Sequence, residues 1–367
     1  MMLALVISSL GGGGGERIML DLARGWLARG HGVTIITLSS PATDAYPIPV
    51  GARRIALDCM GGEGGWIAAP WRVLRRLQRL RSALRETAPD VVIAFMVPTT
   101  ALAVVAARDL GARVLVHELV DPGMEKVGAA YAWLRRVTYP RAAIVIAQTP
   151  RAAVVLRRLA PGSDVRVAPG FVPPFVIEEP PPPRTTPHPI FLAVGRLAPQ
   201  KGFDLLLAAF ARLASSLPEW GLRIVGSGAL ERELGMQAAR LGIASRVEWV
   251  PRTPRPWDQV THDTIFVLSS RYEGFPNVLL EAMALGLPPV AFDCPSGPAE
   301  IVTPGVNGVL VPADSVEALA AAMQALAANT ALRQRLAAAA LDVRCDWSLD
   351  RALDSWDQYL RPSSTAA

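Results

Sequence analysis

Short apolar runs alternate with longer amphipathic runs along the whole chain. In the first half, runs rich in β-branched residues predict six strands: Leu3–Ser8, Val33–Leu38, Val91–Phe95, Val114–His117, Ile144–Ala147 and Val165–Val167. In the second half, similar runs predict five strands: Ile190–Val194, Leu222–Val225, Val247–Val250, Ile265–Leu268 and Pro289–Phe292. Because these runs are apolar throughout and are separated by amphipathic stretches, they predict parallel sheets covered by helices on both faces.

A proline-rich segment at residues 173–189 separates the two halves of this pattern. Proline at that density continues neither a helix nor a sheet, so we interpret the segment as a linker. The sequence therefore predicts an α/β protein with two Rossmann-like, doubly wound domains, at residues 1–172 and 190–345, and a terminal helix within residues 346–367. Such sheets bind ligands at the carboxyl ends of their strands, which predicts a site in a cleft between the domains.

The composition fits two folded domains. Of the 367 residues, 51% are hydrophobic and 19% are charged, which excludes wholesale disorder. The three cysteines are far apart and lack a C-x-x-C spacing, which favours free thiols in a reducing compartment over a disulfide framework or a zinc site. The apolar start lacks a basic segment, and the apolar stretch Val91–Ala107 is interrupted by Pro98. We therefore expect neither a signal peptide nor a membrane span.

Basic residues are concentrated in the first half of the chain. Residues 1–180 hold 21 Lys and Arg against 14 Asp and Glu, with an arginine-rich stretch between Trp71 and Arg85. This excess predicts an anionic partner, for which a bilayer surface, a lipid diphosphate and a nucleic acid are the candidates. A solvated helix face in an arginine-rich protein explains the same pattern equally well.

Five consecutive glycines, residues 11–15, follow the first predicted strand and precede Glu16 and Arg17. At a strand-to-helix turn, glycines let backbone N–H groups approach a phosphate at the positive end of the helix. Glu16 or Arg17 falls where the third glycine of G-x-G-x-x-G belongs, which disfavours NAD binding. A tight turn without a ligand is the alternative interpretation.

The loop Gly195-Arg-Leu-Ala-Pro-Gln-Lys-Gly202 follows the first strand of the second domain. Its Arg196 and Lys201 can converge on a diphosphate, the arginine as a planar fork and the lysine as a point charge. Lys201 is one of only two lysines in the chain, so lysine is not its default basic residue. A second glycine turn, Gly226-Ser-Gly228, could lie under a phosphate or merely turn the chain.

The most specific constellation is Ser270-Arg-Tyr-Glu-Gly-Phe-Pro-Asn-Val-Leu-Leu-Glu281. Glu273 lies in the loop after a predicted strand, and Glu281 lies within a helix that starts near Asn277. Free N–H groups at that helix start can bind hydroxyl or phosphate oxygens. Apolar residues surround Glu281 on nearly every helix face, where an unpaired carboxylate is costly. A pair of ribose hydroxyls would satisfy it.

Together these segments resemble a known family. The E-x7-E block, the G-R-x4-K-G loop and Gly13-Gly-Gly-Glu-Arg17 are similar to those of the retaining, GT-B-fold glycosyltransferases of family 4, in the same order over almost the whole chain. The segments from Arg271 and from Phe292 to Glu300 resemble a subset that builds bacterial capsules and exopolysaccharides, the amylovoran-type galactosyltransferases among them. The chain departs from the family at Gly15, where alanine is more usual, and at His117, where close relatives often read Ser-Glu-Arg-Asn-Asp.

The resemblance implies a role for each matched residue. Arg196 and Lys201 would hold the donor diphosphate, and Glu281 would bind the ribose. Glu273 and His117 would contact the transferred sugar, although a structural histidine also fits a strand end. Further donor contacts are implied for residues at the two helix starts and after the third strand of the second domain: Gly13, Gly14, Arg252, Phe275, Pro276, Asn277 and Val278. The terminal helix would cross back onto the first domain.

The implied function is retaining transfer of a hexose from a nucleotide diphosphate sugar, with a UDP-sugar favoured and GDP-mannose next. The acceptor would be a lipid-linked glycan or polysaccharide in bacterial surface glycan synthesis. The enzyme would be cytoplasmic and peripheral on the inner face of the membrane. The sequence has no D-x-D pair, so we expect no metal and no cofactor. Basic side chains and helix N-termini would take the place of a metal.

Two other classes of function compete with this interpretation. An NDP-sugar epimerase or an inverting transferase shares the two-domain plan, but neither is expected to carry the E-x7-E block. A nucleic-acid-binding protein is the non-enzymatic alternative, because the first half is rich in arginine. Few aromatic residues are interleaved with the basic run and no recognised binding module is present, so we expect no nucleic acid partner.

Overall fold

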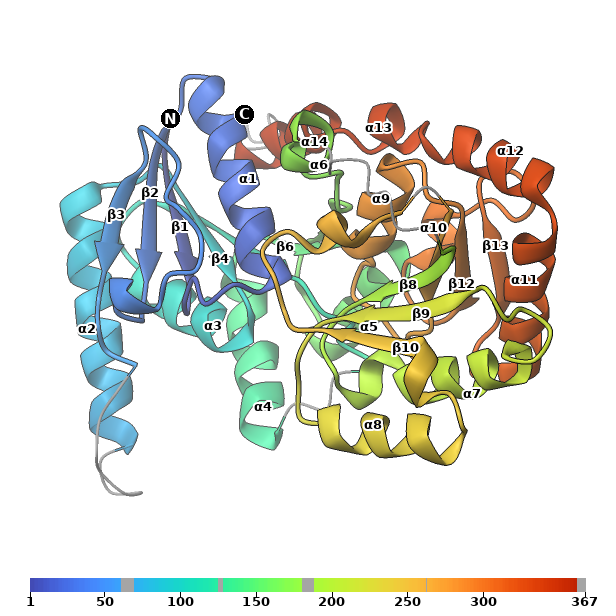
Figure 1. The fold of residues 1–367 in the computed structure, drawn as a ribbon. Coiled ribbons are helices and arrows are strands. Elements are labelled where there is room, and N and C mark those ends of the chain that lie inside the picture. Colours follow the sequence, from blue (N-terminus) through green and yellow to red (C-terminus); the bar gives the residue numbers. More distant parts are fainter. Residues whose placement is uncertain (61–68, 125–127, 180–187, 262, 362–367) are drawn as a thin grey trace. The chain divides into compact units, whose positions relative to one another are not determined.

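A computed structural model of the protein describes residues 1–60, 69–124, 128–179, 188–261 and 263–361 (Figure 1). The chain divides into two compact units. The first comprises Met1–Gly170 together with the C-terminal segment that starts at Leu349, and the second comprises Phe171–Ser348. The second unit is therefore a continuous insertion into the chain of the first.

The first unit is built on a seven-stranded parallel sheet with the order β3-β2-β1-β4-β5-β6-β7. Its strands are β1 (Met2–Ile7), β2 (Gly32–Thr37), β3 (Arg53–Ala56), β4 (Val91–Phe95), β5 (Arg113–Glu118), β6 (Ile144–Ala147) and β7 (Val165–Val167). The order of the strands reverses between β1 and β4. In a Rossmann-like sheet, ligands bind at such a reversal.

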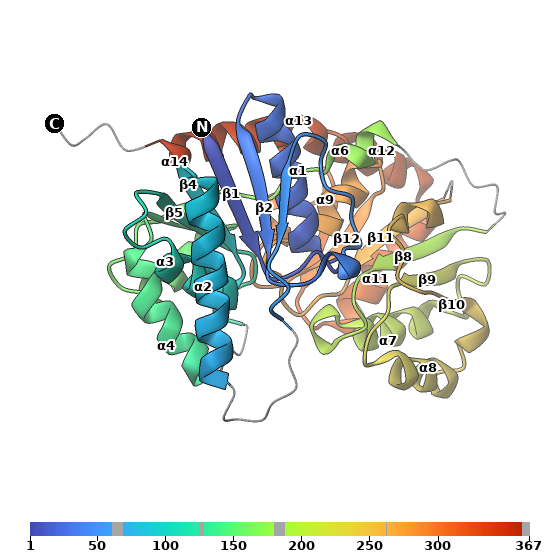
Figure 2. The same cartoon turned by 90° about the vertical axis from the view of Figure 1, so that its left-hand side faces the viewer.

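Helices cover both faces of this sheet, with α2, α3 and α4 on one side of the strands and α1 on the other (Figure 2). The helices of the unit are α1 (Gly14–Ala28), α2 (Ala69–Thr87), α3 (Val97–Ala106), α4 (Ala129–Thr138), α5 (Pro150–Leu159) and α14 (Leu349–Leu360). Ala4 and Val6 of β1 pack in one core with Leu80 of α2. Leu3 and Leu5 are also buried and face the opposite layer, because successive side chains of a strand alternate.

The second unit has a six-stranded parallel sheet with the order β10-β9-β8-β11-β12-β13. Its strands are β8 (Ile190–Val194), β9 (Gly221–Val225), β10 (Val247–Val250), β11 (Thr264–Leu268), β12 (Pro289–Asp293) and β13 (Val309–Pro312). Its helices are α6 (Pro174–Glu178), α7 (Phe203–Leu213), α8 (Glu231–Arg240), α9 (Asn277–Ala284), α10 (Pro298–Ile301), α11 (Val316–Ala328), α12 (Thr330–Ala340) and α13 (Val343–Asp346). One core contains residues of α7, α8 and α11, and another contains residues of α6 and α9.

The predicted fold class, two Rossmann-like parallel sheets, is confirmed. Every predicted strand is present, with ends that differ by at most one residue. Strands β3 and β13 were not predicted. Both lie at sheet edges and are only half-buried. An edge strand with one open side needs no continuous apolar run, and β3 begins with Arg53 and Arg54.

The segment predicted as a linker, residues 173–189, contains a short helix. Helix α6 starts at Pro174, and its Val176 is buried in the core of the second unit. Proline fits the first turn of a helix because its missing N–H would have no partner there. Residues 180–187 of the segment lie outside the described part of the chain. The N–H of Val172 donates to the carbonyl of Trp347 at 2.8 Å, so the start and the end of the second unit are joined.

The C-terminal helix α14 belongs to the first unit and packs against α1. Arg29, at the end of α1, lies 2.7 Å from a carboxylate oxygen of Asp357. The hydroxyl of Tyr359 donates to a backbone carbonyl of β7 at 2.8 Å. Gly25 lets the two helices approach closely, because a Cβ at this position would lie 2.3 Å from the Cδ1 atom of Leu353.

Candidate functional site

The loops after β8 and β11 flank the point where the second sheet reverses its strand order. Arg196 and Lys201 lie in the first loop, and Glu273 lies in the second. The loops are in direct contact, because the N–H of Arg271 donates to the carbonyl of Gln200 at 2.8 Å. The structure therefore brings two of the predicted motifs together at the sheet edge where Rossmann-like folds hold ligands.

Lys201 and Glu273 form a largely buried ion pair. The Nζ atom of Lys201 lies 2.6 Å from Oε1 of Glu273, and the two side chains are 14% and 6% exposed. The hydroxyl of Ser270 donates to the same Oε1 at 2.6 Å. Because the ammonium group has three N–H bonds, Lys201 can keep this contact and still donate to an anion. Lys201 and Ser270 both bind Oε1 of Glu273. The other oxygen, Oε2, can therefore accept a hydrogen bond from a substrate hydroxyl.

Close backbone approaches explain two glycines of these loops. Gly202 has a φ of 61°, and a Cβ at this position would lie 2.0 Å from the carbonyl oxygen of Ser269. A Cβ at Gly226 would lie 1.9 Å from the carbonyl oxygen of Gly195. Neither position can hold a larger side chain without displacing the neighbouring loop. Loop packing therefore requires the glycine that begins the second turn, whatever that turn binds.

Glu281 is buried in α9, as its apolar neighbours predicted. Its side chain accepts a hydrogen bond at Oε2 from the indole Nε1 of Trp257 at 2.8 Å, and the residue is 5% exposed. Trp257 is itself buried. The indole stabilises the carboxylate without neutralising its charge, so Glu281 keeps its capacity to accept from hydroxyl groups. Trp257 was not predicted as part of the site, because a tryptophan in a short polar stretch does not indicate its partner.

The remaining predicted residues of the E-x7-E block lie at the start of α9. Phe275 and Pro276 are buried, and Asn277 and Val278 are half-buried. The Nδ2 group of Asn277 lies 3.4 Å from the carbonyl of Phe275. The Oδ1 atom of Asn277 is buried and has no hydrogen-bond partner among the described residues. A buried acceptor in that state is costly unless a ligand or water binds it.

The two predicted donor-binding arginines are exposed. The guanidinium of Arg196 lies 3.4 Å from Oε1 of Gln200, in the same loop as Lys201. The N–H of Arg252, in the loop after β10, donates to the hydroxyl of Ser227 at 3.1 Å. These contacts place both residues on the carboxyl side of the second sheet, but neither arginine joins the buried ion pair.

Cys294 lies near the ion pair and is buried. Burial, together with the negative charge of Glu273, raises the pKa of its thiol to about 12. The thiol therefore stays protonated at neutral pH, and a protonated thiol is not a nucleophile.

His117 lies at the carboxyl end of β5 in the first unit and is 2% exposed. The rings of Phe95 and Trp356 pack edge-to-face against its imidazole, with ring centroids 5.4 and 5.1 Å away. Burial lowers the pKa of His117 to about 3, so the imidazole is neutral at neutral pH. Neither ring nitrogen has a hydrogen-bond partner in the described part of the chain.

The predicted glycine loop lies at the start of α1. Gly13 is the N-cap residue, and the helix begins at Gly14. The carboxylate of Glu16 folds back over this end, because a Cβ at Gly13 would lie 2.3 Å from its Oε2. A Cβ at Gly15 would lie 2.6 Å from Cδ1 of Leu119, so an alanine there would require the tip of that side chain to move. An anion that binds this helix start would therefore have to displace Glu16.

A buried polar network next to His117 was not predicted. Oε2 of Glu118 accepts a hydrogen bond from the hydroxyl of Tyr139 at 2.6 Å and lies 3.2 Å from the guanidinium of Arg135. Burial, assisted by the charge of Glu118, raises the pKa of Tyr139 well above its ordinary value. The network ties the end of β5 to α4. Its residues come from separate stretches of the sequence, so no local pattern could have revealed it.

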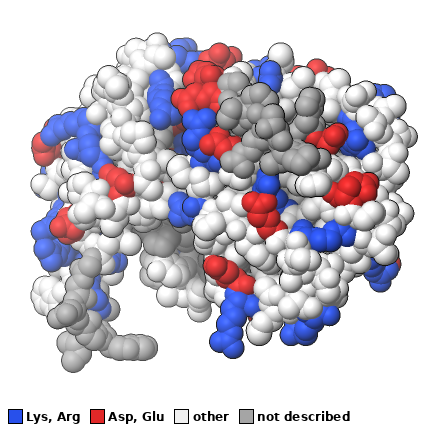
Figure 3. Space-filling model, in the orientation of Figure 1, with Lys and Arg blue, Asp and Glu red and all other residues white. Residues whose placement is uncertain are grey.

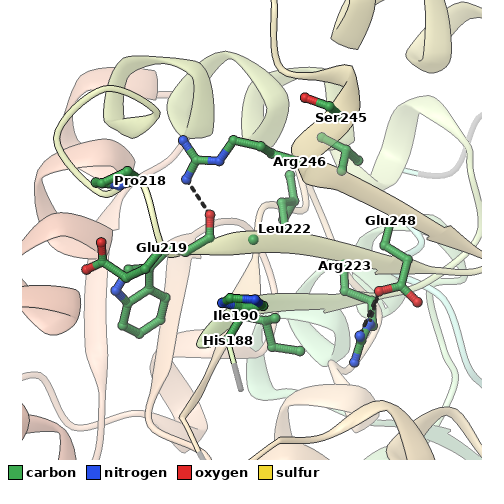
Figure 4. A pocket seen from close by; sticks show the side chains of 12 residues that line it. His188, Ile190, Pro218, Glu219, Leu222, Arg223, Ser245, Arg246 and Glu248 are labelled. Carbon is green, nitrogen blue, oxygen red and sulfur yellow. Dashed lines mark hydrogen bonds and ion pairs between the residues drawn. The ribbon is translucent and has the colours of Figure 1, made fainter. Parts of the chain in front are cut away.

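A surface pocket of about 630 Å³ lies at the opposite, amino-terminal edge of the second sheet (Figure 4). Its lining includes Arg223 and Arg246 but none of the predicted site residues. Arg223 pairs with Glu248 at 2.6 Å, and Arg246 donates to backbone carbonyls, including that of Trp220. Because these cations already have partners within the fold, the pocket does not match the expected diphosphate site.

The described part of the chain has neither a membrane-spanning helix nor a cluster of metal ligands. None of the helices in this part of the chain combines the length and the hydrophobicity that crossing a bilayer requires. Nor do any three His, Cys, Asp or Glu side chains gather there in an arrangement that could hold a metal ion.

Two family models match the chain. Residues 13–170 match the glycosyl transferase 4-like domain, and residues 177–343 match glycosyl transferases group 1. The first match falls in the first unit and the second in the second unit. The chain therefore belongs to the glycosyltransferases that carry these two domains.

Curated relatives align with part of the chain. The lipopolysaccharide 1,6-galactosyltransferase of Salmonella typhimurium is 31% identical over 231 residues, which cover 62% of each protein. The amylovoran biosynthesis glycosyltransferase AmsD of Erwinia amylovora is 34% identical over 46% of this chain and 47% of its own length. An uncharacterized glycosyltransferase of Haemophilus influenzae is 35% identical over 46% of this chain and 48% of its own. The chain thus spans less than two thirds of the length of each of these relatives.

Solved structures resemble the whole chain. Sucrose-phosphate synthase from Thermosynechococcus elongatus has a TM-score of 0.81 and 20% identity, with 98% of both chains covered. Alr3699/HepE of Anabaena, in complex with UDP and glucose, has a TM-score of 0.78 and 18% identity, with 98% of this chain and 99% of that one covered. At these identities the likeness concerns the fold, which is GT-B as predicted.

The neutral state of His117 predicts how stability responds to pH. The pKa of His117 is about 3 in the folded protein and 6.5 ordinarily. Between these pH values, therefore, His117 takes up a proton only in the unfolded chain. The free energy of unfolding should therefore fall as the pH is lowered from 6.5 towards 3, and His117→Phe should reduce that fall. Denaturant unfolding at pH 7 and pH 5 measures the effect, with exposed His188→Phe as the control. An identical pH dependence in wild type and His117→Phe would contradict the assignment.

Proposed function

We propose that this protein is a retaining glycosyltransferase that moves a hexose from a nucleotide diphosphate sugar to a glycan acceptor. The observation that carries the proposal is the Lys201–Glu273 ion pair at the strand-order reversal. A cation and a carboxylate at this edge suit a diphosphate and a sugar, and buried Glu281 suits a ribose. Arg196, in the same loop as Lys201, would add a second cation for the diphosphate.

The chemistry follows from where charge develops. As the C1–O bond of the donor stretches, the diphosphate gains negative charge, which Lys201 and Arg196 would stabilise without a metal. The sugar gains oxocarbenium character, and the acceptor hydroxyl attacks the face that the diphosphate leaves. The proton of that hydroxyl passes to the departing phosphate oxygen. No residue of the chain is required to form a covalent intermediate.

His117 would bind the transferred sugar as a neutral group. Its low pKa excludes an imidazolium at neutral pH, so it would not act as a general acid. A neutral imidazole has one donor and one acceptor nitrogen, and both are without partners among the described residues. A sugar hydroxyl could bind either nitrogen.

The relatives support the choice of donor and acceptor. A UDP-sugar is favoured because the structurally similar Alr3699/HepE is described in complex with UDP and glucose. GDP-mannose comes next, since a lipopolysaccharide core mannosyltransferase of Rhizobium meliloti is 36% identical over 40% of this chain and 42% of its own length. The galactosyltransferase and amylovoran relatives favour a lipid-linked glycan or a polysaccharide as the acceptor.

We also propose that the first unit associates with an anionic membrane surface. Trp71 and Leu74 of α2 are 72% and 41% exposed, and they share a helix face with exposed Arg75. Trp133 of α4 is 63% exposed. The amino-terminal ends of α2 and α4 lie at the same end of the unit in both ribbon views (Figures 1 and 2). Exposed tryptophan beside arginine suits the headgroup region of a bilayer.

Two arginines of α2 have hydrogen-bond partners within the first unit. Arg76 donates to the carbonyl of Cys59 at 3.0 Å, and Arg79 donates to that of Leu57 at 2.6 Å. These two side chains therefore hold the chain after β3, whereas Arg75 is exposed. On the face shown in Figure 3, basic and acidic side chains are interspersed. Attraction to a membrane would thus depend on local groups such as Trp71 and Arg75 more than on net charge.

Removing the proposed charge stabilisers should impair transfer. Lys201→Ala and Arg196→Ala should each lower turnover by about two to four orders of magnitude, because the leaving diphosphate loses a preorganised cation. Sugar transfer from a panel of nucleotide sugars measures turnover, and calorimetry with UDP measures donor binding. Arg212→Ala is the matched control, since it removes an exposed cation paired with Glu317 in the same unit. Full turnover in either site variant would remove that residue from the mechanism.

The stereochemistry and the metal requirement can be tested on the wild type. The product should have the anomeric configuration of the donor, and transfer should persist in EDTA. Nuclear magnetic resonance of the purified product reports the anomer, and parallel assays with and without chelator report the metal requirement. An inverted anomer, or epimerised donor formed without acceptor, would refute retention, and loss of activity in EDTA would refute metal independence.

Membrane association should depend on the exposed end of α2. The double variant Trp71→Ser/Arg75→Gln should bind phosphatidylglycerol vesicles about tenfold more weakly, because an interfacial ring and a cation are lost. Co-sedimentation at fixed ionic strength measures this binding. Arg240→Gln, an exposed arginine in α8, controls for the change in net charge. Equal binding by wild type and the double variant would assign this face to solvent.

A further inference from the structure

The orientation of His117 depends on aromatic rings. Neither of its nitrogens has a hydrogen-bond partner in the described residues, so packing alone holds the imidazole. Phe95 packs against it from the preceding strand in the sheet, and Trp356 packs against it from α14. The ring plane of Trp356 is inclined at 81° to the imidazole. Removing Trp356 would therefore release one side of the histidine ring.

Trp356 is itself firmly held. It is 1% exposed, and its ring packs edge-to-face against that of Trp26 in α1 at a centroid distance of 5.6 Å. Arg29 of α1 lies 2.8 Å from Asp354 and 2.7 Å from Asp357, on either side of Trp356 in the sequence. Because this packing is tight, a displacement of helix α14 would also displace the imidazole of His117.

Trp347, nine residues before Trp356 in the chain, contacts the E-x7-E block of the second unit. The ring of Trp347 packs against that of Phe275 at a centroid distance of 5.4 Å, within the second unit. Phe275 lies midway between Glu273 and Asn277 in the loop before α9. The carbonyl of Trp347 accepts a hydrogen bond from Val172, so its backbone is fixed as well. Ser348 alone separates Trp347 from the start of α14.

We propose that Trp347 and Trp356 are positioning residues for sugar transfer, Trp356 for His117 and Trp347 for the loop that carries Glu273. Trp356 belongs to the first unit and Trp347 to the second, so each assignment is carried by contacts within one unit. The proposal rests on the proposed function. It is favoured because a buried imidazole with two unpartnered nitrogens is a poor core residue. A phenylalanine or leucine would fill a purely structural place between Phe95 and Trp356 at lower cost.

Paired substitutions in the full-length protein test both assignments. Trp356→Leu should lower kcat about ten- to one-hundredfold and leave the Kd for UDP within about threefold, because only the sugar contact is disturbed. Trp347→Leu should raise the Kd for UDP and the donor KM about tenfold, because the donor loop loses its support. The conservative variants Trp356→Phe and Trp347→Phe should each restore the affected parameter to within about threefold. Trp249→Leu, at a half-buried position of β10 in the second unit, is the control for loss of a tryptophan.

A spectroscopic measurement tests the Trp356 assignment without any assay of transfer. The chain has four histidines, so their ring signals can be resolved by nuclear magnetic resonance. The His117 signal should not titrate between pH 5 and pH 8 in the wild type or in Trp356→Phe. In Trp356→Leu it should shift and begin to titrate in this range, because water reaches the ring.

The outcomes separate this proposal from the proposed function. If the wild type binds no nucleotide and transfers no sugar, the proposed function fails, and the His117 signal still tests the contact with Trp356. An unchanged His117 signal in Trp356→Leu would overturn that assignment. Equal falls in kcat, UDP affinity and Tm in both leucine variants, without rescue by phenylalanine, would show a purely structural role and would overturn the proposal.

Discussion

The candidate site depends on one buried ion pair, between Lys201 and Glu273. Its two members come from loops after different strands, and each loop is held against the other by backbone contacts that only Gly202 permits. Loss of one partner would leave an uncompensated charge in a poorly solvated place, which is costly. The pair therefore keeps the site nearly neutral until an anion arrives. A diphosphate can then share the ammonium group without dismantling the loops.

The sequence predicted the architecture well, because buried parallel strands are apolar throughout. It failed at two edge strands, at β3 because the strand is half-buried and begins with two arginines, and at β13 although the four-residue run is apolar. Lys201 and Glu273 could be paired from sequence only through their motifs, since they are 72 positions apart in the chain. Trp257 could not be predicted from the sequence, because its hydrogen bond to Glu281 depends on how the segment after β10 packs against α9.

Burial determines the chemistry of the titratable groups around the predicted motifs. It keeps the Cys294 thiol protonated and the His117 imidazole neutral, although both residue types often serve as nucleophile or acid in enzymes. The sequence shows that these residues are present but cannot show how deeply they are buried. Lys201 and Glu281 instead have specific partners in the fold, the carboxylate of Glu273 and the indole of Trp257.

The insertion of the second unit into the first has a consequence for biosynthesis. Helix α14 is made only after Phe171–Ser348, so a ribosome exposes the α1 surface around Trp26 throughout that interval. The second unit is continuous and can fold as soon as it emerges, whereas the first must wait for its last helix. A nascent chain that stalls within the second unit would therefore present an apolar, aggregation-prone face, which a chaperone would have to shield.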